Sequence, residues 1–358
     1  MERSAEMDKV KVGVIGCGNM AQMAHIPCIK ANPDAELTAI CDFRKKVTAE
    51  LCRRWNIPFA TDSADELLMQ DLDAVYVLTP QQAHLSNIRA ALAAGKAVFT
   101  EKPVAMSASG VRELSALPGK GVTVGYMKQH ETNIRKLKEI QSSSDWGKLL
   151  FIRNHSFVGK QWNGALGDLE KACSSDEKPV FSAAGLDPAP AWLKGERDEK
   201  FYSFDNPYYG LLDTGCHSVN LLRHLAGSVP KVLGVNSGNG VRVVHFDFNG
   251  TPGEMEFCVN FRMDRWDEVT ELYFERASVR ILTPPPLDRQ SSAVVEIYTE
   301  NSGLHQNLVL EDTRKWAFRL ETDAFIRKVK EGCFSSDLDE AADDVAVIEQ
   351  IYRIEMGV

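Results

Sequence analysis

The stretch Val12-Gly-Val-Ile-Gly16-Cys-Gly18-Asn-Met-Ala21 lies near the start of this 358-residue chain and decides the first part of its fold. It overlaps a short, largely apolar run, Val10–Ile15, and glycines follow this run at once. Such a run is typical of a strand that is buried on both faces and ends in a tight turn. Residues from about Met20 to Ala31 have a helical pattern, so the stretch predicts a strand, a glycine turn and a helix in succession.

The spacing of the small residues in this turn, G-x-G-x-x-A, favours the binding of a dinucleotide. Gly16 permits the tight turn, and Gly18 has no side chain to keep a pyrophosphate away from the backbone. Ala21 allows the helix to pack closely on the strand, and the helix N-terminus offers N–H groups to the phosphates. The residues expected to line this part of the site are Gly16, Gly18, Asn19 and Met20.

Asp42 ends the second predicted strand, Leu37–Asp42, and follows the glycine turn by about twenty residues. A carboxylate at this position can accept hydrogen bonds from both ribose hydroxyls and repels a 2′-phosphate, which favours NAD over NADP. Arg44 weakens this preference, because a guanidinium two residues away can pair with a phosphate. The plain alternative is a glycine turn that binds no ligand, with Asp42 on the surface.

The remainder of the first 125 residues alternates predicted strands with predicted helices. Strands separated by helices imply right-handed crossovers, so we expect a parallel sheet and an α/β domain over residues 1–128. Further strands are expected at Ala74–Leu78, Ala97–Glu101 and Val122–Tyr126, and helices at Arg44–Trp55, from Asp62 or Ser63 to Met69, at His84–Ala94 and at Ala108–Leu117.

The pattern changes after a polar region near Gln129–Gly147. Strands then follow one another with turn signals between them, which predicts an antiparallel or mixed sheet in a second, α+β domain over residues 129–358. We expect the last helices to pack back on the structure. The strands are expected at Phe151–Val158, Lys231–Ser237, Val241–Asn249, Gly253–Arg262, Val269–Phe274, Ala277–Leu282 and Val294–Thr299, and the helices at about Gly210–Ala226, Asp312–Glu331 and Leu338–Met356.

The composition excludes several classes of protein. Lys and Arg number 41 against 50 Asp and Glu, and this net charge of −9 argues against nucleic acid, whose phosphates need a basic face. No apolar run reaches the ~18 residues of a membrane span. The charged N-terminus, Met1–Lys9, lacks the apolar stretch of a secretory signal. The eight cysteines form no C-x-x-C pair, so we expect reduced thiols and a cytoplasmic location.

Ligands of open α/β sheets gather at the carboxyl edge of the strands, where loops follow each strand. Thr79 and Pro80 form such a loop after the strand Ala74–Leu78, and we expect them to contact the cofactor. His84 starts the next helix and is a further candidate for lining this crevice. The alternative for His84 is a solvated residue in the first turn of its helix.

Three motifs resemble one known family, in the same order along nearly the whole chain. They are Gly16-Cys-Gly18-Asn-Met-Ala21 with His25 and Pro27, then Ala97-Val-Phe-Thr-Glu101-Lys102-Pro103, then Asp213-Thr-Gly-Cys-His217. Together they are similar to the glucose–fructose oxidoreductase and inositol dehydrogenase (Gfo/Idh/MocA) family, and the Glu-Lys-Pro piece after a strand is the most specific of them.

The resemblance implies an N-terminal Rossmann domain and a C-terminal α+β domain with a large open sheet, which in this family commonly pairs into homodimers or homotetramers. It implies hydride transfer between a nicotinamide and a secondary alcohol or ketone of a sugar, amino sugar, sugar nucleotide or cyclitol. In the family, the lysine of Glu-Lys-Pro and the aspartate and histidine of the later motif surround the reacting hydroxyl. These correspond to Lys102, Asp213 and His217, with Glu101 also at the cofactor.

Hydride transfer from an alcohol carbon requires that the hydroxyl also loses a proton, while charge develops on its oxygen. Lys102 supplies a cation for that oxygen. Asp213 and His217 are four residues apart and share one face of a helix, with His217 as the acid–base group and Asp213 orienting it or the substrate. The alternative for Lys102 is a solvated surface charge, and the alternative for Asp213 and His217 is a local salt bridge within the helix. A metal site at Asp213 and His217 would have only two ligands, which is too few.

Two departures from the family's pattern put the substrate in doubt more than the reaction. Tyr208 and Tyr209 stand where a glycine pair is expected, and two rings there would narrow the substrate pocket. The segment Gly159–Ser203 is unusually long and rich in Trp, Asp, Glu and Lys. Tyr126 and Lys128 close the first domain and are further candidates for contact with substrate.

Two other functions remain open at this point. One is a glycoside hydrolase that uses a bound NAD transiently, as some relatives of the family do. The other is a catalytically silent dinucleotide-binding protein on the same fold, against which the presence of Lys102, Asp213 and His217 argues.

Overall fold

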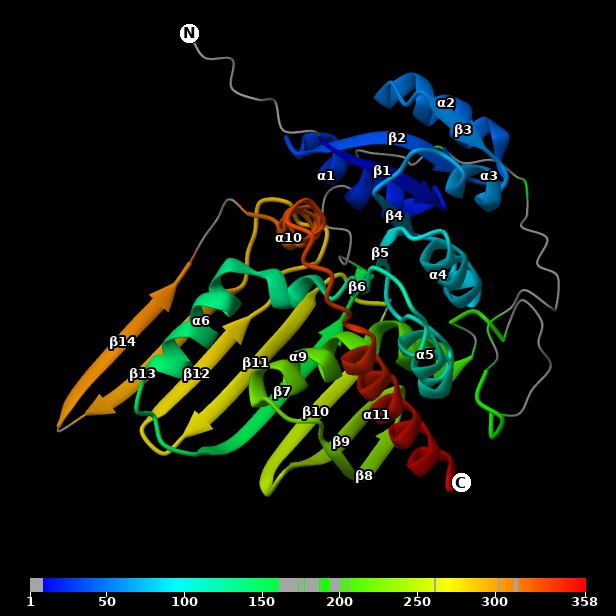
Figure 1. Cartoon of the computed structure of the whole chain (residues 1–358). Helices are drawn as coiled ribbons and strands as arrows, with labels where there is room; N and C mark the ends of the chain where they lie inside the picture. Colours follow the sequence, from blue (N-terminus) through cyan, green and yellow to red (C-terminus); the bar gives the residue numbers. More distant parts are fainter. Residues whose placement is uncertain are drawn as a thin grey trace, which may run out of the picture. The chain divides into compact units, whose positions relative to one another are not determined.

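The computed structural model divides the chain into two compact units (Figure 1). The first unit comprises Met1–Gly125, Lys171–Ala189 and Glu321–Ala342, and the second comprises Tyr126–Glu170, Pro190–Leu320 and Asp343–Val358. The domain division expected after residue 128 stays a prediction. The structure describes residues 9–160, 173, 177, 187, 189–193, 201–204, 206–260, 262–301, 303–311 and 315–358.

The first unit is built on a parallel sheet with the strand order β3-β2-β1-β4-β5-β6, which confirms the predicted α/β class. The strands are β1 (Val10–Ile15), β2 (Ala35–Cys41), β3 (Phe59–Thr61), β4 (Ala74–Val77), β5 (Ala97–Thr100) and β6 (Val122–Val124). The helices that connect them are α1 (Ile26–Ala31), α2 (Lys45–Trp55), α3 (Ala64–Leu68), α4 (His84–Ala93) and α5 (Ala108–Ser115).

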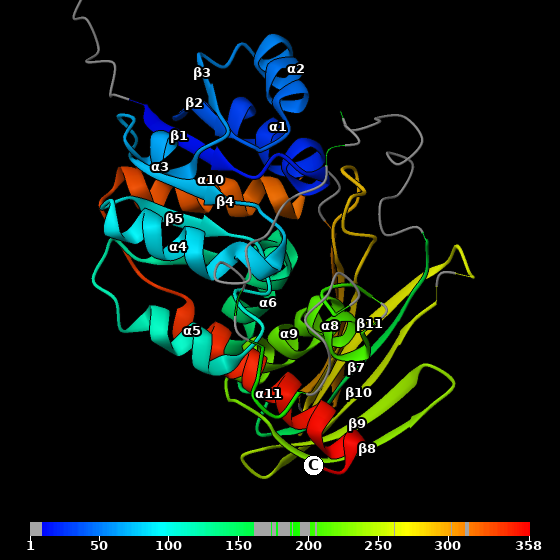
Figure 2. The same ribbon diagram turned by 90° about the vertical axis from the view of Figure 1, so that its right-hand side faces the viewer.

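A late helix, α10 (Ala317–Lys330), contributes its residues from Glu321 onward to the first unit. Figure 2 shows α10 running along β4 and β5. The ring of Phe325 meets Tyr76 of β4 and Phe99 of β5 edge-on, with centroids 5.3 and 5.6 Å apart. Buried aromatic pairs in this geometry stabilise packing beyond their area, which explains why a helix so late in the sequence returns to the first sheet.

The second unit is built on a mixed sheet of eight strands, ordered β14-β13-β12-β11-β7-β10-β9-β8. Only β7 and β10 pair in parallel; their other neighbours are antiparallel. The strands are β7 (Leu149–Val158), β8 (Lys231–Gly238), β9 (Val241–Phe248), β10 (Thr251–Val259), β11 (Trp266–Phe274), β12 (Ala277–Leu282), β13 (Val294–Asn301) and β14 (Leu304–Leu310). The predicted α+β domain with a large open sheet is confirmed.

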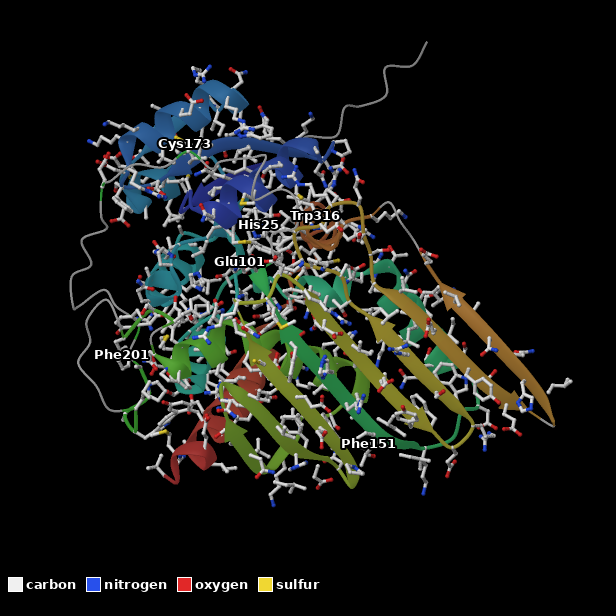
Figure 3. The ribbon with its side chains drawn as sticks, turned by 180° about the vertical axis from the view of Figure 1, so that it is seen from behind. His25, Glu101, Phe151, Cys173, Phe201 and Trp316 are labelled. Carbon is white, nitrogen blue, oxygen red and sulfur yellow. The ribbon has the colours of Figure 1, made fainter. Side chains whose placement is uncertain are left out.

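Helices cover one face of this sheet. They are α6 (Thr132–Ser143), the short α8 (Pro207–Gly210), α9 (Cys216–Ala226) and the part of α11 (Leu338–Met356) that belongs to the second unit. α9 packs on β7, and α6 packs on β13. Along β7, Ile152, Asn154, Ser156 and Val158 are buried beneath the helices, while the alternate residues point to the other face, which Figure 3 shows from behind without a helix in front of it.

Strands β3 and β14 are absent from the sequence-based prediction. β3 has three residues, too few for a periodic signal. β14 is exposed along most of its length, so its residues show no alternation between buried and exposed positions. In the described part of the chain, no helix combines the length and the apolar character needed to cross a bilayer.

Glu321 is a buried carboxylic acid in the α10 part of the first unit. Its side chain is fully buried, and neither oxygen has a hydrogen-bond partner among the described residues. Burial raises its pKa well above the ordinary value, and the nearby charge of Glu101 raises it further. The folded chain therefore holds the proton of Glu321 at pH values where the unfolded chain releases it.

We expect Glu321→Gln to stabilise the protein at neutral pH. Below about pH 4.3, the carboxyl is protonated in both states and the two variants are similar. As pH rises, only the unfolded wild type releases the proton. The free energy of unfolding of wild type therefore falls by about 1.4 kcal/mol per pH unit, until the pH reaches the pKa of Glu321 in the folded chain. Urea unfolding at pH 4 and pH 7.5 measures this, with the exposed Glu331→Gln as control. An equal effect of Glu321→Gln at both pH values would contradict the assignment.

Candidate active site

The glycine turn after β1 lies against the end of β4. Gly16 has a φ of +94°, and a Cβ there would lie 2.6 Å from the backbone of Leu78 and Thr79. Gly18 is different, because a Cβ at that position would meet nothing within 4 Å. The first glycine is therefore required by the fold, whereas the second leaves open space at the carboxyl edge of the sheet, where a pyrophosphate would approach the backbone.

Asn19 and Met20 follow the turn at its surface, Asn19 exposed and Met20 half-buried. The helix that they open begins as a π-helical turn, Ala21–His25, and continues as α1. A π-helical turn inside a helix is frequent at functional sites. The predicted strand, turn and helix are thus present, with the four cofactor-binding candidates at the edge where ligands of such sheets bind.

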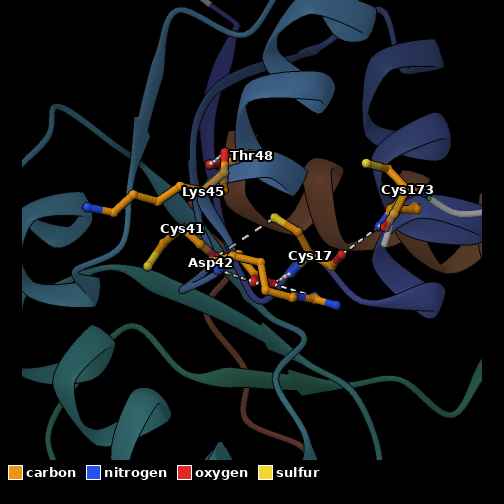
Figure 4. Close-up of polar contacts among 8 residues, drawn as sticks. Cys17, Cys41, Asp42, Lys45, Thr48 and Cys173 are labelled. Carbon is orange, nitrogen blue, oxygen red and sulfur yellow. Dashed lines mark hydrogen bonds and ion pairs between the residues drawn. The ribbon is translucent and has the colours of Figure 1, made fainter. Parts of the chain in front are cut away.

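Asp42 lies directly after β2 and is buried at the glycine turn, so the alternative of a surface residue is wrong. Figure 4 shows it beside Cys17, whose backbone N–H donates to Asp42 Oδ2 over 2.8 Å. The Arg44 guanidinium donates to both oxygens, each over 2.8 Å. Burial alone would raise the pKa of Asp42, but the hydrogen bonds from Arg44 and Cys17 outweigh burial and hold it below the ordinary value.

A residue that the sequence analysis missed joins this turn to a distant segment. The Gln22 amide nitrogen donates to the carbonyls of Cys17 (2.8 Å) and Cys173 (3.0 Å), and its oxygen accepts from the Cys173 N–H over 2.7 Å. Gln22 and Cys173 are separated by 151 residues, and no local sequence pattern predicts such a contact. Most of the long segment Gly159–Ser203 lies outside the described residues.

The loops after β4 and β5 carry the next candidates. Thr79 is half-buried and Pro80 exposed. His84 is buried, with Nδ1 2.8 Å from the carbonyl oxygen of Pro103 and Nε2 2.7 Å from that of Thr79. The alternative of a solvated first-turn residue is therefore wrong. Both ring nitrogens face backbone carbonyls, so the ring supports these loops instead of offering a hydrogen bond to a ligand.

Glu101 and Lys102 follow β5, and Glu101 is held from inside the unit. Its Oε1 lies 2.8 Å from Nε2 of the buried His25, and its Oε2 accepts from the Lys102 N–H over 3.0 Å. Figure 3 shows His25 and Glu101 close together. Burial would raise the pKa of Glu101, but His25 and Lys102 hold it below the ordinary value, so the carboxylate is ionised. The Lys102 side chain is partly exposed at this edge.

In the second unit, Asp213 lies in a π-helical turn, Leu211–Gly215, and His217 lies in the first turn of α9. Both are half-buried. The leucines expected on the buried side of this segment are all buried: Leu211, Leu212, Leu221, Leu222 and Leu225. The ring of Tyr126 stands edge-on to His217, with centroids 6.3 Å apart. The convergence of Lys102 with Asp213 and His217 stays a prediction, because they belong to different units.

A buried polar network beneath α9 is another feature that the sequence analysis missed. Asp344 accepts from the Arg223 guanidinium (2.6 Å) and from the Asn220 amide (2.7 Å). Asn220 also accepts from Gln129 over 2.7 Å. A buried ion pair with satisfied hydrogen bonds fixes its members tightly, so this network sets the position of α9 and thereby of His217.

Two of the substrate candidates have other partners in the second unit. The Lys128 ammonium is buried in an ion pair with Glu268. Tyr208 is fully buried, and its ring meets those of Trp192 and Tyr352. A role of these two residues in contacting substrate therefore finds no support. Tyr126 is buried as well, but its ring is the one that stands edge-on to His217, so its role stays a prediction. Tyr209 is half-buried and retains partial exposure.

Comparison with known proteins agrees with this geometry. Residues 10–126 match the model of the oxidoreductase family with an NAD-binding Rossmann fold. An inositol 2-dehydrogenase/D-chiro-inositol 3-dehydrogenase of Lacticaseibacillus casei is 32% identical over 151 residues, which are 40% of this chain and 43% of that protein. A dTDP-3,4-didehydro-2,6-dideoxy-alpha-D-glucose 3-reductase of Actinomadura kijaniata is 36% identical over 104 residues, 29% of this chain and 31% of that one. The chain spans less than half the length of these curated relatives.

Solved structures resemble the whole chain in fold. KijD10, a 3-ketoreductase from Actinomadura kijaniata in complex with NADP and TDP-benzene, superposes with a TM-score of 0.69 at 19% identity, over 96% of this chain and 97% of that one. Apo scyllo-inositol dehydrogenase from Lactobacillus casei superposes with a TM-score of 0.69 at 15% identity, over 98% of this chain and 97% of that one. The predicted resemblance is confirmed over the dinucleotide-binding part: residues 10–126 match the Gfo/Idh/MocA family of oxidoreductases, and the inositol dehydrogenase is similar over 40% of the chain.

The two glycines of the turn provide a matched pair of variants. We expect Gly16→Ala to lower both thermal stability and dinucleotide affinity, because its Cβ would overlap the backbone of Leu78 and Thr79. Gly18→Ala has room for its Cβ, so its melting temperature should match wild type, while dinucleotide binding weakens by at least about tenfold. Calorimetry and binding titration with NAD measure the two effects. Undiminished NAD binding by Gly18→Ala would place the pyrophosphate elsewhere.

Proposed function

We propose that the protein is an NAD(H)-dependent oxidoreductase that transfers a hydride between the nicotinamide and a secondary alcohol or ketone. Its substrate class would be a sugar, amino sugar, sugar nucleotide or cyclitol. The observation that carries this proposal is the ionised, buried Glu101 that holds the backbone of Lys102 at the carboxyl edge of the first sheet. The relatives named as inositol dehydrogenase and sugar-nucleotide 3-reductase support the substrate class.

In this proposal, the nicotinamide accepts or supplies the hydride, and the chain's residues position and polarise the alcohol oxygen. Lys102 stabilises the charge that develops on this oxygen. His217 takes or returns the hydroxyl proton, and Asp213 orients His217 or the substrate. The network around Asp344 supports this role, because it fixes the helix that carries His217.

For the cofactor, we propose NAD before NADP. The Asp42 carboxylate lies where the adenosine ribose would bind, and its charge would repel a 2′-phosphate. Arg44 is bound to both Asp42 oxygens, so it would have to leave this pair to reach a 2′-phosphate. KijD10 was solved with NADP, and its 19% identity with this chain carries no inference about the preference here.

We expect Lys102→Met and His217→Ala each to lower kcat by about 10²-fold or more while NAD affinity stays near wild type. The reason is that both groups act on the reacting oxygen, whereas the dinucleotide is held by the glycine turn and Asp42. Stopped-flow NADH absorbance with a panel of cyclitols and sugars measures hydride transfer, and thermal shift with NAD and NADP measures binding.

The outcome decides between the functions. Near-wild-type hydride transfer in both variants would place the catalytic groups elsewhere. Cleavage of glycosides without net NADH formation would indicate the hydrolase, and tight NAD binding without hydride transfer on any substrate of the panel would indicate a silent binding protein. A larger thermal shift with NADP than with NAD would overturn the cofactor preference.

We further propose that the open face of the second sheet pairs two copies of the chain. This face carries half-exposed apolar rings, including Phe151 and Phe157, between ion pairs. Arg153 pairs with Glu271 over 2.7 Å, and His155 with Glu256 over 2.5 Å. Rings interleaved with paired charges on a broad sheet suit an interface with a second copy, which needs about 800 Å² per partner.

Phe151→Glu should shift this assembly toward monomers, because it places an unpaired charge on the interface. Multi-angle light scattering over a concentration series measures the mass. Met69→Glu, at an exposed position of the first unit, is the control and should leave the mass unchanged. A wild-type mass for Phe151→Glu, or a monomeric wild type, would rule out this face.

A further inference from the structure

Lys102 lies between two residues that are each tied to a buried imidazole. On one side, the Glu101 carboxylate bonds His25 through Oε1 and accepts the Lys102 N–H through Oε2, over 2.8 and 3.0 Å. On the other side, the carbonyl oxygen of Pro103 lies 2.8 Å from Nδ1 of His84. The backbone on both sides of Lys102 is therefore anchored inside the first unit.

The same two imidazoles connect three neighbouring loops. His25 belongs to the π-helical turn after β1, and Glu101 and Pro103 follow β5. His84 also reaches the Thr79 carbonyl, in the loop after β4, over 2.7 Å. Strands β1, β4 and β5 are adjacent in the sheet, so these loops form a continuous stretch of its carboxyl edge. Whatever holds the loops together also fixes Lys102 relative to the glycine turn.

The bonds of His84 have a chemical peculiarity. Carbonyl oxygens only accept hydrogen bonds, and a neutral imidazole carries a single N–H. The neutral ring can therefore donate to Pro103 or to Thr79, while its other nitrogen directs a lone pair at the remaining carbonyl. Only the imidazolium form, with a proton on each nitrogen, donates to both.

We propose that His84 and His25 are positioning residues that clamp Lys102 to the dinucleotide-binding edge, and that His84 makes its second hydrogen bond only as the imidazolium. The proposal rests on the proposed function, in which Lys102 polarises the reacting oxygen. His84 itself touches neither the substrate nor the cofactor in this proposal; it acts through Pro103 and Thr79.

Several groups set the charge of His84. Burial lowers its pKa, the two carbonyls and the Glu101 charge raise it, and the Lys102 charge lowers it, so the value lies below the ordinary one. Asp187 accepts from the Leu85 N–H at the start of the same helix over 3.2 Å, and burial raises its pKa to about 8. The loops are thus joined by two hydrogen bonds below the lowered pKa of His84 and by one hydrogen bond above it.

Three substitutions of His84 separate the two bonds. In His84→Asn, the new side-chain amide can replace Nδ1 and keep the bond to Pro103, whereas the longer amide of His84→Gln reaches toward Thr79 in place of Nε2. His84→Ala keeps neither. We expect kcat to fall at least about tenfold in His84→Ala and His84→Gln, and His84→Asn to restore most of it, with the KM for NAD changed less than kcat in all three.

The experiment combines turnover with two measurements that need no substrate. Nitrogen NMR of ring-labelled histidine reports whether one or both His84 nitrogens carry a proton between pH 5 and pH 8, and the Lys102 amide signal reports the loop. We expect two protonated nitrogens below the lowered pKa of His84 and one above it, a Lys102 amide signal that shifts with this change, and no such shift in His84→Asn. His305→Asn, on the exposed strand β14, is the control.

The results distinguish the two proposals. If wild type transfers no hydride but the Lys102 amide follows His84, the proposed function fails and the clamp stands. The clamp is wrong if wild type transfers hydride and all His84 variants keep its kcat. It is also wrong if the Lys102 amide signal changes neither with the titration of His84 nor in His84→Ala.

Discussion

The structure of the candidate site depends on one buried charge, the Glu101 carboxylate. A carboxylate removed from water must be paired and hydrogen-bonded, or it takes up a proton. Glu101 meets this requirement through His25 and the Lys102 N–H, and its pKa stays below the ordinary value in spite of burial. Glu321 nearby has no such partners among the described residues, and its pKa is raised. The fold thus provides hydrogen-bond partners for the Glu101 carboxylate, which directly precedes Lys102, the residue that we propose to be catalytic.

In the proposed function, each unit has its own part of the chemistry. The first unit would bind the dinucleotide at the carboxyl edge of β1, β4 and β5, with Lys102 as the cation, and the second would supply Asp213 and His217 from a helix that a buried network holds in place. The relatives match this chain mainly over its dinucleotide-binding part, whereas whole-chain similarity is limited to the fold. This distribution is expected where the cofactor is shared and the substrate differs, because the shared chemistry constrains only the first unit.

Sequence reasoning succeeded where the signals are local. The glycine turn, the alternation of strands and helices around it, the late strands of the second sheet and the position of Asp42 all follow from spacing and periodicity, because each depends on neighbours in the chain. It failed where partners are distant: nothing in the sequence pairs Gln22 with Cys173, Asn220 with Asp344 or His84 with two carbonyls. It also judged Lys128 and Tyr208 to be available to substrate, because residue type alone does not reveal that Glu268 pairs with one and Trp192 packs on the other.

The central claim is that Lys102 and a bound nicotinamide share the carboxyl edge of the first sheet. A crystal structure of the chain soaked with NAD tests this most directly. The account predicts a pyrophosphate over Gly18, ribose hydroxyls at Asp42, and the nicotinamide ring beside Lys102. A dinucleotide bound away from the glycine turn, or a nicotinamide on the far side of the sheet from the lysine ammonium, would contradict it.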